Sequence, residues 1–395
     1  MKKLLIVLSV LILGGVLFFT GCQQTAVTSA KVYMQQNNYD KAIEQCKVAI
    51  AQVPNDPDAY FILGQSYGEK GMYSEMIDAL NKTVSINPKY SPQVQEYKTK
   101  YFTQLFNNGV GLIKQGKYDQ AAENYRLCIA IFPQKTDSYK NLGYVYTQLK
   151  NDSAAIDTYK KAALVDSTDM EVQSSLGVLY YRNKQYDKAV TALKTVLAKA
   201  KSDSKQYMDA LFYTAYSYDL LQQGDKAIEL YSNALKLNPD NKDLLFNVGR
   251  LYLVKADYPN AVDRFRKVVT LDPNDFDANF NSGFCLFQLK KHEESLPYLK
   301  KSVEVKPDNT SAWAALVVAL DQAGRKDSES YLLIGRGLLQ LQKPKEAVPY
   351  LKKSVDLKAD SIPAWEKLVE ALNQAELPKE AKDAQKKLDA LKGGK

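Results

Sequence analysis

Histidine and cysteine are scarce in this chain, which limits the chemistry that it could perform. The 395 residues include one histidine, His292, and four cysteines, Cys22, Cys46, Cys128 and Cys285. No two cysteines form a C-x-x-C pair, so neither a zinc site nor a redox motif has the spacing it needs. The sequence also lacks a glycine-rich phosphate loop and a nucleophile elbow. We therefore expect no enzyme activity, no metal and no cofactor.

Blocks of one charge are also missing. The chain has 53 lysines and arginines against 45 aspartates and glutamates, which gives a net charge of +8. The charges are interspersed, with no basic arm of the kind that binds nucleic acid. This distribution is typical of solvated outer faces, and nucleic acid is not an expected partner.

The N-terminus has the features of an export signal. Lys2 and Lys3 precede an apolar run from Leu4 to Phe19. The run is short for a membrane-spanning helix, which needs about 20 apolar residues. It fits the hydrophobic region of a secretory signal peptide better.

The residues after this run, Thr20-Gly21-Cys22, resemble the lipobox of bacterial lipoproteins. In that family a diacylglycerol is attached to the cysteine, the chain is cut before it, and the new N-terminus is acylated. The resemblance implies that residues 1–21 are a signal peptide and Cys22 the lipidation site. Phe19 departs from the usual leucine three residues before the cysteine. The alternative is an uncleaved signal anchor, and both interpretations place residues 23–395 outside the cytoplasm.

Proline recurs with a fixed period of 34 residues. The prolines that keep this period in two separate series are Pro54 and Pro88, then Pro239, Pro273 and Pro307. The stretch from Asp243 to Pro273 holds two amphipathic helical patterns joined by a short turn. A period of this size indicates an array of helical repeats.

Residues within this period resemble the tetratricopeptide repeat (TPR) pattern. The pattern has large residues at positions 4, 7, 11 and 24, small residues at 8, 20 and 27, and proline at 32. Repeat 242–275 matches it with Leu245, Gly249, Tyr252, Ala261, Phe265 and Pro273. Repeat 136–169 matches it with Tyr139, Leu142, Gly143, Tyr146, Ala155, Tyr159 and Ala162. The resemblance implies an all-α, right-handed TPR superhelix (an α-solenoid) of about ten helix-turn-helix repeats plus a half repeat.

The positions at which the TPR pattern recurs along the chain predict the bounds of each repeat. A TPR array over 22–309 holds repeats near 23–56, 57–90, 102–135, 136–169, 170–203, 208–241, 242–275 and 276–309. Residues 91–101 and 204–207 are extra, and we expect both to lie at the start of a first helix. Residues 310–327 break the phase, either as a half repeat or because one helix serves two repeats. Two C-terminal repeats with an end cap occupy 328–395.

The pattern also assigns structural roles to individual residues. Glycine at position 8 and alanine at position 20 allow the two helices of one repeat to pack closely. We expect the large residues at positions 4, 7, 11 and 24 to fill the space between neighbouring repeats. Cys46 and Cys128 fall on core positions, and His292 takes a place held by tyrosine in other repeats.

With no catalytic constellation, function is expected in a surface. In TPR proteins the first helices line a concave groove through positions 2, 5, 9, 12 and 13. On this chain the resemblance gives an aromatic groove, composed of Phe61, Phe106, Tyr144, Tyr181, Phe212, Tyr216, Phe246, Arg250, Phe280, Phe284 and Phe287. An apolar stripe of this kind is typical of a binding site, although the same side chains could bury one another in superhelical packing. A carboxylate clamp for acidic tails is not expected, because no repeat has asparagine at position 9.

Taken together, these features predict a lipid-anchored scaffold of the bacterial cell envelope that binds other proteins through its groove. The resemblance is to lipoproteins that help to assemble outer-membrane proteins, pili or secretion systems. Two alternatives remain: an uncleaved signal-anchored adaptor, and an envelope carrier or sensor that binds a glycan or small ligand.

Overall fold

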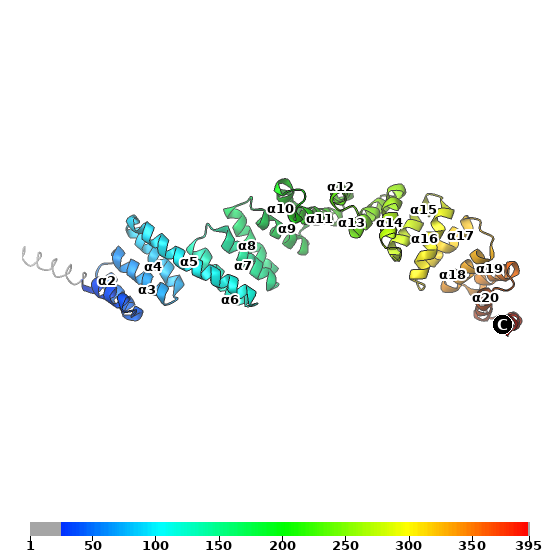
Figure 1. Cartoon of the computed structure of the whole chain (residues 1–395), viewed down its shortest axis with the longest axis horizontal. Helices are drawn as coiled ribbons and strands as arrows, with labels where there is room; N and C mark the ends of the chain where they lie inside the picture. The colour runs from blue at the N-terminus through cyan, green and yellow to red at the C-terminus, as the bar shows by residue number, and fades with distance from the viewer. Residues whose placement is uncertain (1–24, 394–395) are drawn as a thin grey trace, which may run out of the picture. The chain divides into compact units, whose positions relative to one another are not determined.

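The computed structural model describes residues 25–393, and all regular secondary structure in this range is helical. The expected signal peptide and Cys22 lie outside the described residues. The chain divides at residue 200 into two units. Each unit is an α-solenoid in which consecutive helices pack against one another (Figure 1).

The first unit consists of a helical segment at 25–35, nine further α-helices and one 3-10 helix. These are α2 (Tyr39–Gln52), α3 (Pro57–Glu69), α4 (Tyr73–Ile86), a 3-10 helix η1 (Pro88–Tyr90), α5 (Ser91–Lys114), α6 (Tyr118–Ile131), α7 (Thr136–Gln148), α8 (Asp152–Val165), α9 (Met170–Arg182) and α10 (Tyr186–Lys199).

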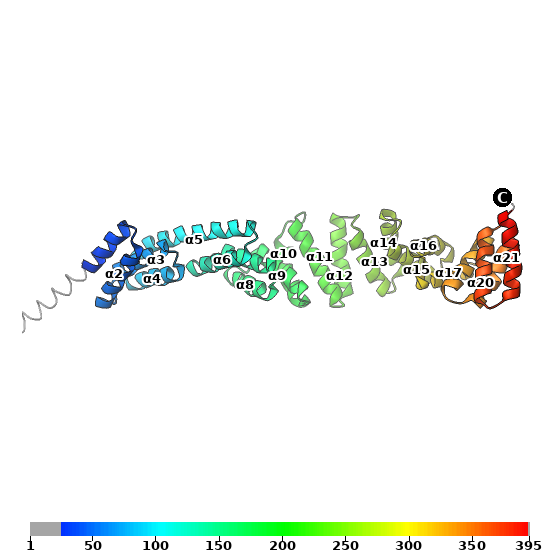
Figure 2. The ribbon, with the colours of Figure 1, turned by 90° about the horizontal axis from the view of Figure 1, so that it is seen from below.

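The second unit continues with α11 (Lys205–Leu220), α12 (Gly224–Leu237), α13 (Lys242–Val254), α14 (Tyr258–Leu271), α15 (Phe276–Gln288), α16 (His292–Val305), α17 (Thr310–Gln322), α18 (Ser328–Gln340), α19 (Pro344–Leu357), α20 (Ile362–Gln374) and α21 (Pro378–Gly393). Figure 2 shows the last two of these helices, α20 and α21, side by side in orange and red.

Both groups of extra residues lie where a first helix begins. Helix α5 is 24 residues long, starts at Ser91 and carries Pro92 in its first turn. Proline is favoured there because its missing N–H would have no partner within the helix. Helix α11 starts at Lys205, and the Ser204 hydroxyl caps it by accepting a hydrogen bond from the Tyr207 N–H.

Close packing within a repeat depends on glycine at position 8, as the sequence predicts. An ideal Cβ built on Gly249 would lie 2.9 Å from the Phe265 ring, and one on Gly143 would lie 2.6 Å from the Tyr159 ring. Phe265 and Tyr159 hold position 24 of the same repeats. The expectation that position 24 serves packing between repeats is therefore corrected: its side chain fills the space that glycine leaves inside its own repeat.

The turn between the two helices of a repeat passes through the left-handed region of backbone conformation. The residues with positive φ recur at position 15, and most are not glycine: Asn37, Lys150, Lys184, Gln222, Ala256, Lys290, Gln342 and Glu376, with Gly71, Gly116 and Gly324. This conformation closes the turn between antiparallel helices, and it is costly for a residue that has a Cβ.

The cysteines and the histidine have structural environments. Cys46, Cys128 and Cys285 are buried free thiols, and burial raises the pKa of each to about 12. The prediction of a core role for Cys46 and Cys128 is confirmed. His292 opens helix α16 and its ring lies 4.9 Å from that of Phe287. Tyr186 opens α10 and packs in the same way on Tyr181, at 6.0 Å, so His292 does replace a turn tyrosine.

The phase break at 310–327 contains a single helix, α17, which packs against both α16 and α18. Helix α18 carries two glycines on opposite faces. A Cβ on Gly337 would lie 2.5 Å from Val317 of α17, whereas a Cβ on Gly335 would lie 2.4 Å from Leu351 of α19. Helix α18 thus packs as the second helix for α17 and as the first helix for α19, which corresponds to the interpretation of one helix serving two repeats.

Residues 296–320 and 348–372, whose sequences align at a shift of 52 residues, share local structure. The Trp313 indole N–H donates to the Pro307 carbonyl at 2.8 Å, and Trp365 donates to the Ala359 carbonyl at the same distance.

Between residues 25 and 393, no helix combines the length and apolar character that crossing a bilayer requires.

Candidate partner-binding surface

The predicted groove residues lie on the first helices of the repeats. In each unit, we call the surface lined by these helices its first-helix face: α3, α5, α7 and α9 form it in the first unit, and α11, α13 and α15 form it in the second. Every residue predicted to line the groove belongs to one of these seven helices.

These side chains are neither fully buried nor, with one exception, freely exposed. Tyr144 is 44% exposed. The others are half-buried: Phe61, Phe106, Tyr181, Phe212, Tyr216, Phe246, Arg250, Phe280, Phe284 and Phe287. Half-burial means that each ring leaves part of its apolar surface open to a partner while the rest packs on the protein.

In the first unit the groove aromatics pack on other rings. Phe61 of α3 lies 5.5 Å from Tyr90 and 6.2 Å from Tyr97, between ring centroids. Phe106 of α5 stacks on Phe102 at 5.7 Å and meets Tyr125 edge-on at 5.5 Å. Such contacts hold the rings in fixed orientations.

In the second unit, Phe212 lies 4.6 Å from Tyr216 on the same helix. Phe246 meets the buried Phe265 at 5.4 Å. Phe280 and Phe287 pack against the hydrophobic core that extends from α16 to α21. The aromatic residues of the second unit therefore support the core as well as line the surface.

Arg250, predicted to be the one cation among these aromatics, has a partner within the chain. Its guanidinium forms an ion pair with the Asp219 carboxylate of α11. The arginine therefore links neighbouring first helices.

A pocket of about 330 Å³ opens on the first-helix face of the first unit. Its lining consists of Phe106, Asp137, Lys140, Asn141, Tyr144, Tyr159, Glu171 and Ser175. The Lys140 ammonium lies 3.1 Å from Asp137, 3.4 Å from Asp169 and 3.1 Å from Glu171. Burial lowers the pKa of Lys140, but hydrogen bonds to Glu171 and Asp137 outweigh it, so the pKa lies above its ordinary value.

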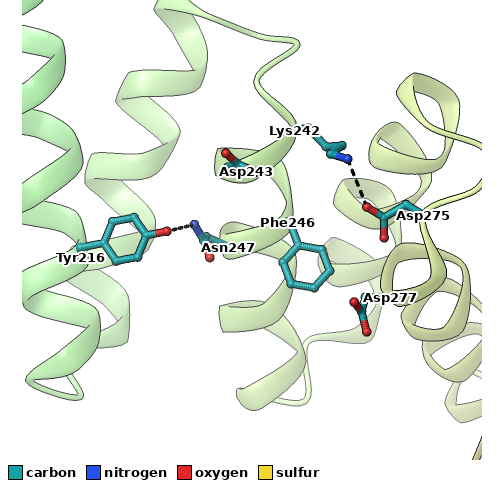
Figure 3. Close-up of a pocket in the computed structure, with 7 residues that line it drawn as sticks. All are labelled: Tyr216, Lys242, Asp243, Phe246, Asn247, Asp275 and Asp277. Atoms are coloured by element: carbon teal, nitrogen blue, oxygen red, sulfur yellow. Dashed lines mark hydrogen bonds and ion pairs between the residues drawn. The ribbon is translucent and has the colours of Figure 1, made fainter.

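A second pocket, of about 270 Å³, lies on the first-helix face of the second unit (Figure 3). Its lining consists of Tyr216, Lys242, Asp243, Phe246, Asn247, Asp275 and Asp277. The Asn247 amide donates to the Tyr216 hydroxyl at 3.0 Å. The Lys242 ammonium reaches Asp275 at 3.5 Å and Asp272 at 3.0 Å.

Sequence reasoning missed the polar half of these pockets. From the sequence, Asp243 and Asp277 are acids in the first turn of a helix, where they favour the helix dipole, yet both also line the second pocket. Asn141 and Asn247, one in each pocket, hold the same repeat position, which the TPR pattern does not specify. A signal was available, because an acid at position 2 recurs with the 34-residue period and a first helix presents that position to the groove.

Family models match most of the chain. A model described as TPR repeat matches residues 30–71. Models described as tetratricopeptide repeat match 57–90, 106–168, 175–242, 219–276, 255–320 and 328–361. Together these matches cover well over half of the sequence.

Curated proteins with similar sequences include members of large complexes. The BBSome complex member BBS4 of Bos taurus is 32% identical over 149 residues, which is 37% of this chain and 27% of that protein. The anaphase-promoting complex subunit CDC16 of Saccharomyces cerevisiae is 23% identical over 252 residues, 63% of this chain and 26% of that protein. The chain thus matches only about a quarter of the length of either relative.

Solved structures with a similar fold include YrrB and the pilF protein of Pseudomonas aeruginosa. YrrB, described as a TPR protein with an unusual peptide-binding site, is 22% identical, with a TM-score of 0.44 over 49% of this chain and 98% of that one. The pilF protein of Pseudomonas aeruginosa is 16% identical, with a TM-score of 0.40 over 58% of this chain and 99% of that one. At these scores neither likeness indicates a function.

Proposed function

Because the chain belongs to the tetratricopeptide repeat family, we propose that it is a non-enzymatic scaffold that binds a partner protein through its first-helix face. The observation that carries this proposal is the row of half-buried aromatic side chains on that face. Partly open rings held in place by their neighbours are suited to anchoring a partner, because little side-chain entropy is lost on binding.

The names of the relatives support a role in assembly. Both BBS4 and CDC16 are named as members of multisubunit complexes. A repeat array offers each neighbouring repeat as part of one extended surface, which suits a protein that holds others together.

We further propose that the protein acts in a bacterial cell envelope, anchored by lipid at Cys22. The support is the lipobox-like sequence Thr20-Gly21-Cys22 after an apolar run. The class of partner is then an envelope assembly or secretion component. An uncleaved signal anchor would give the same location with a different N-terminus.

A glycan or small-molecule ligand is the other candidate. The two pockets on the first-helix face measure about 270 Å³ and 330 Å³. Sites for small molecules usually measure about 300–1,000 Å³ and enclose most of the ligand. One of these pockets is smaller than this range and the other is at its lower end, which favours single side chains of a protein segment.

Photo-crosslinking in intact cells tests the proposed face. A benzoylphenylalanine would replace Tyr144 or Phe284 on the first-helix face, and Leu164 of α8 as the control. Leu164 is 88% exposed and lies on a second helix, so it reports encounters without face preference. We expect one protein to be captured from Tyr144 and Phe284 and not from Leu164. Equal capture from all three positions, or from Leu164 alone, would contradict the proposal.

A further inference from the structure

The two pockets on the first-helix face are built from equivalent repeat positions, 106 residues apart. The acidic and amide positions that correspond are Asp137 and Asp243, Asn141 and Asn247, Asp169 and Asp275, and Glu171 and Asp277. The position of the lysine differs: Phe246 corresponds to Lys140, whereas Lys242 of the second pocket corresponds to Thr136. The chain therefore contains its own comparison for what these acidic positions can hold.

In the first unit the three acidic positions hold an ammonium group. The Lys140 Nζ lies 3.1–3.4 Å from Asp137, Asp169 and Glu171. Asp169 also caps α9, accepting hydrogen bonds from the Glu171 and Val172 N–H groups with Oδ1, and it faces the ammonium with Oδ2. The cap fixes this carboxylate in place, so the site for a cation is built into the fold.

The same cap is present in the second unit. Asp275 caps α15 by accepting from the Ala278 N–H at 2.9 Å through Oδ1. Its Oδ2 faces the Lys242 ammonium at 3.5 Å, and this lysine lies closer to Asp272, at 3.0 Å. The second pocket thus repeats the geometry around its capping aspartate.

The two remaining carboxylates differ between the units. Within residues 25–393, no ion pair joins Asp243 or Asp277 to a cation, whereas their equivalents Asp137 and Glu171 both contact Lys140. Figure 3 shows the Phe246 ring between these two aspartates. An aromatic face flanked by carboxylates suits a cationic side chain, since the ring accommodates its apolar stem or its charge.

We propose that the pocket around Phe246 binds a lysine or arginine side chain from an extended segment of the partner protein. This proposal rests on the proposed function and adds the chemistry of the partner. In the first unit Lys140 pairs with Asp137 and Glu171 from within the chain. In the second unit Lys242 pairs with Asp272 and Asp275, and the partner supplies the cation for Asp243 and Asp277. The chain as a whole carries a net charge of +8, so general electrostatic attraction would not draw a basic segment to it. Capture depends on the local carboxylates.

Fluorescence anisotropy of a labelled hexalysine peptide, with the full chain purified in a neutral detergent, tests the proposal. We expect saturable binding at low ionic strength that weakens as salt screens the charges. The double variant Asp243→Asn/Asp277→Asn should bind at least about tenfold more weakly, because it loses two charged acceptors. The matched control is Glu229→Gln/Asp356→Asn, which makes the same charge change at two exposed second-helix positions and should bind like the unaltered chain.

Two reciprocal variants separate this site from others. Phe246→Lys restores the residue of the first pocket and should abolish hexalysine binding, because the introduced ammonium satisfies the acids. Lys140→Phe should raise the number of peptides bound, because it releases Asp137 and Glu171. Circular dichroism confirms that each variant keeps its helices.

The inference is overturned if hexalysine does not bind, or if Asp243→Asn/Asp277→Asn binds as tightly as the control. If crosslinking from Tyr144 and Phe284 succeeds in that case, the proposed function stands and only the charge of the partner is wrong. Binding of a labelled hexaglutamate peptide in place of hexalysine, lost in Lys242→Ala, would assign the pocket to an acidic segment instead.

Discussion

Glycine at position 8 is the residue on which the helix pairs depend most directly. A side chain at Gly249 would meet the Phe265 ring at 2.9 Å, and Phe265 is fully buried and has no room to move away. We expect Gly249→Leu to lower the free energy of unfolding by about 1–3 kcal/mol or more, as overpacked cores do. Thermal unfolding followed by circular dichroism measures the change.

Two substitutions serve as controls for this prediction. Gly111 also lies in a first helix, but a Cβ there would meet nothing within 4 Å, so Gly111→Leu should be tolerated. His292→Tyr should be tolerated as well, because Tyr186 fills the equivalent place in its repeat. If either control lowers the melting temperature more than Gly249→Leu does, the register of the repeats is misassigned.

For individual residues, the sequence predicted the structural role of the small residues well and the role of the charged residues poorly. Glycine has few uses in a helix, so its recurrence at one position indicated close packing. Aspartate has several uses: Asp243 lies in the first turn of α13, where it favours the helix dipole, and it also lines the pocket. Composition cannot distinguish these roles, because both place an acid in the first turn of a helix.

Substitutions in the turns within the repeats should stabilise the folded protein. Lys150 adopts φ of 58° and Gln222 adopts φ of 59°, a conformation that glycine adopts without steric cost. Substituting either residue by glycine should raise the free energy of unfolding by about 0.5–1 kcal/mol, after the entropy that glycine loses on folding. Chemical denaturation of each single variant measures the gain.

Lys160→Gly provides the opposite case, because Lys160 is exposed within helix α8. Glycine there should destabilise the protein by about 1 kcal/mol. Equal effects of Lys150→Gly and Lys160→Gly would show that the turn conformation does not govern stability at position 15.

Helix α17 shows where the repeat pattern stops being informative. The sequence located the phase break at 310–327 from the offset between two similar segments. It could not choose between a half repeat and a shared helix, because position 8 of α17 is Val317 and the contact is made by Gly337 of the following helix. The TPR pattern expects the small residue at position 8 of the first helix, which is α17 here. It therefore does not detect a pair in which the second helix, α18, supplies the glycine.

At the scale of the whole molecule, the N-terminus determines where the scaffold acts. We expect Cys22→Ala to abolish incorporation of labelled lipid and to release the chain from the membrane fraction, because two or more acyl chains are needed for stable anchoring. Mass spectrometry of the N-terminus gives an independent readout. Labelled lipid on the Cys22→Ala protein would rule out the lipobox interpretation, and a mature N-terminus at Met1 would favour the signal anchor.

The division at residue 200 leads to the last prediction. Each unit has its own hydrophobic clusters, such as the one around Tyr159 and Leu176 in the first unit and the one around Leu316 and Leu351 in the second. In a repeat array stability is approximately a sum of repeat and nearest-neighbour terms. We therefore expect 25–200 and 201–393, expressed separately, each to keep its helix content and to unfold cooperatively.

The hexalysine peptide should then bind the second fragment and not the first, because only the second has Phe246 in place of Lys140. Circular dichroism and anisotropy on the same samples separate folding from binding. A second fragment that melts cooperatively but fails to bind, while the full chain does bind, would mean that residues of the first unit complete the site. A fragment without cooperative unfolding would show that the two units depend on each other for stability.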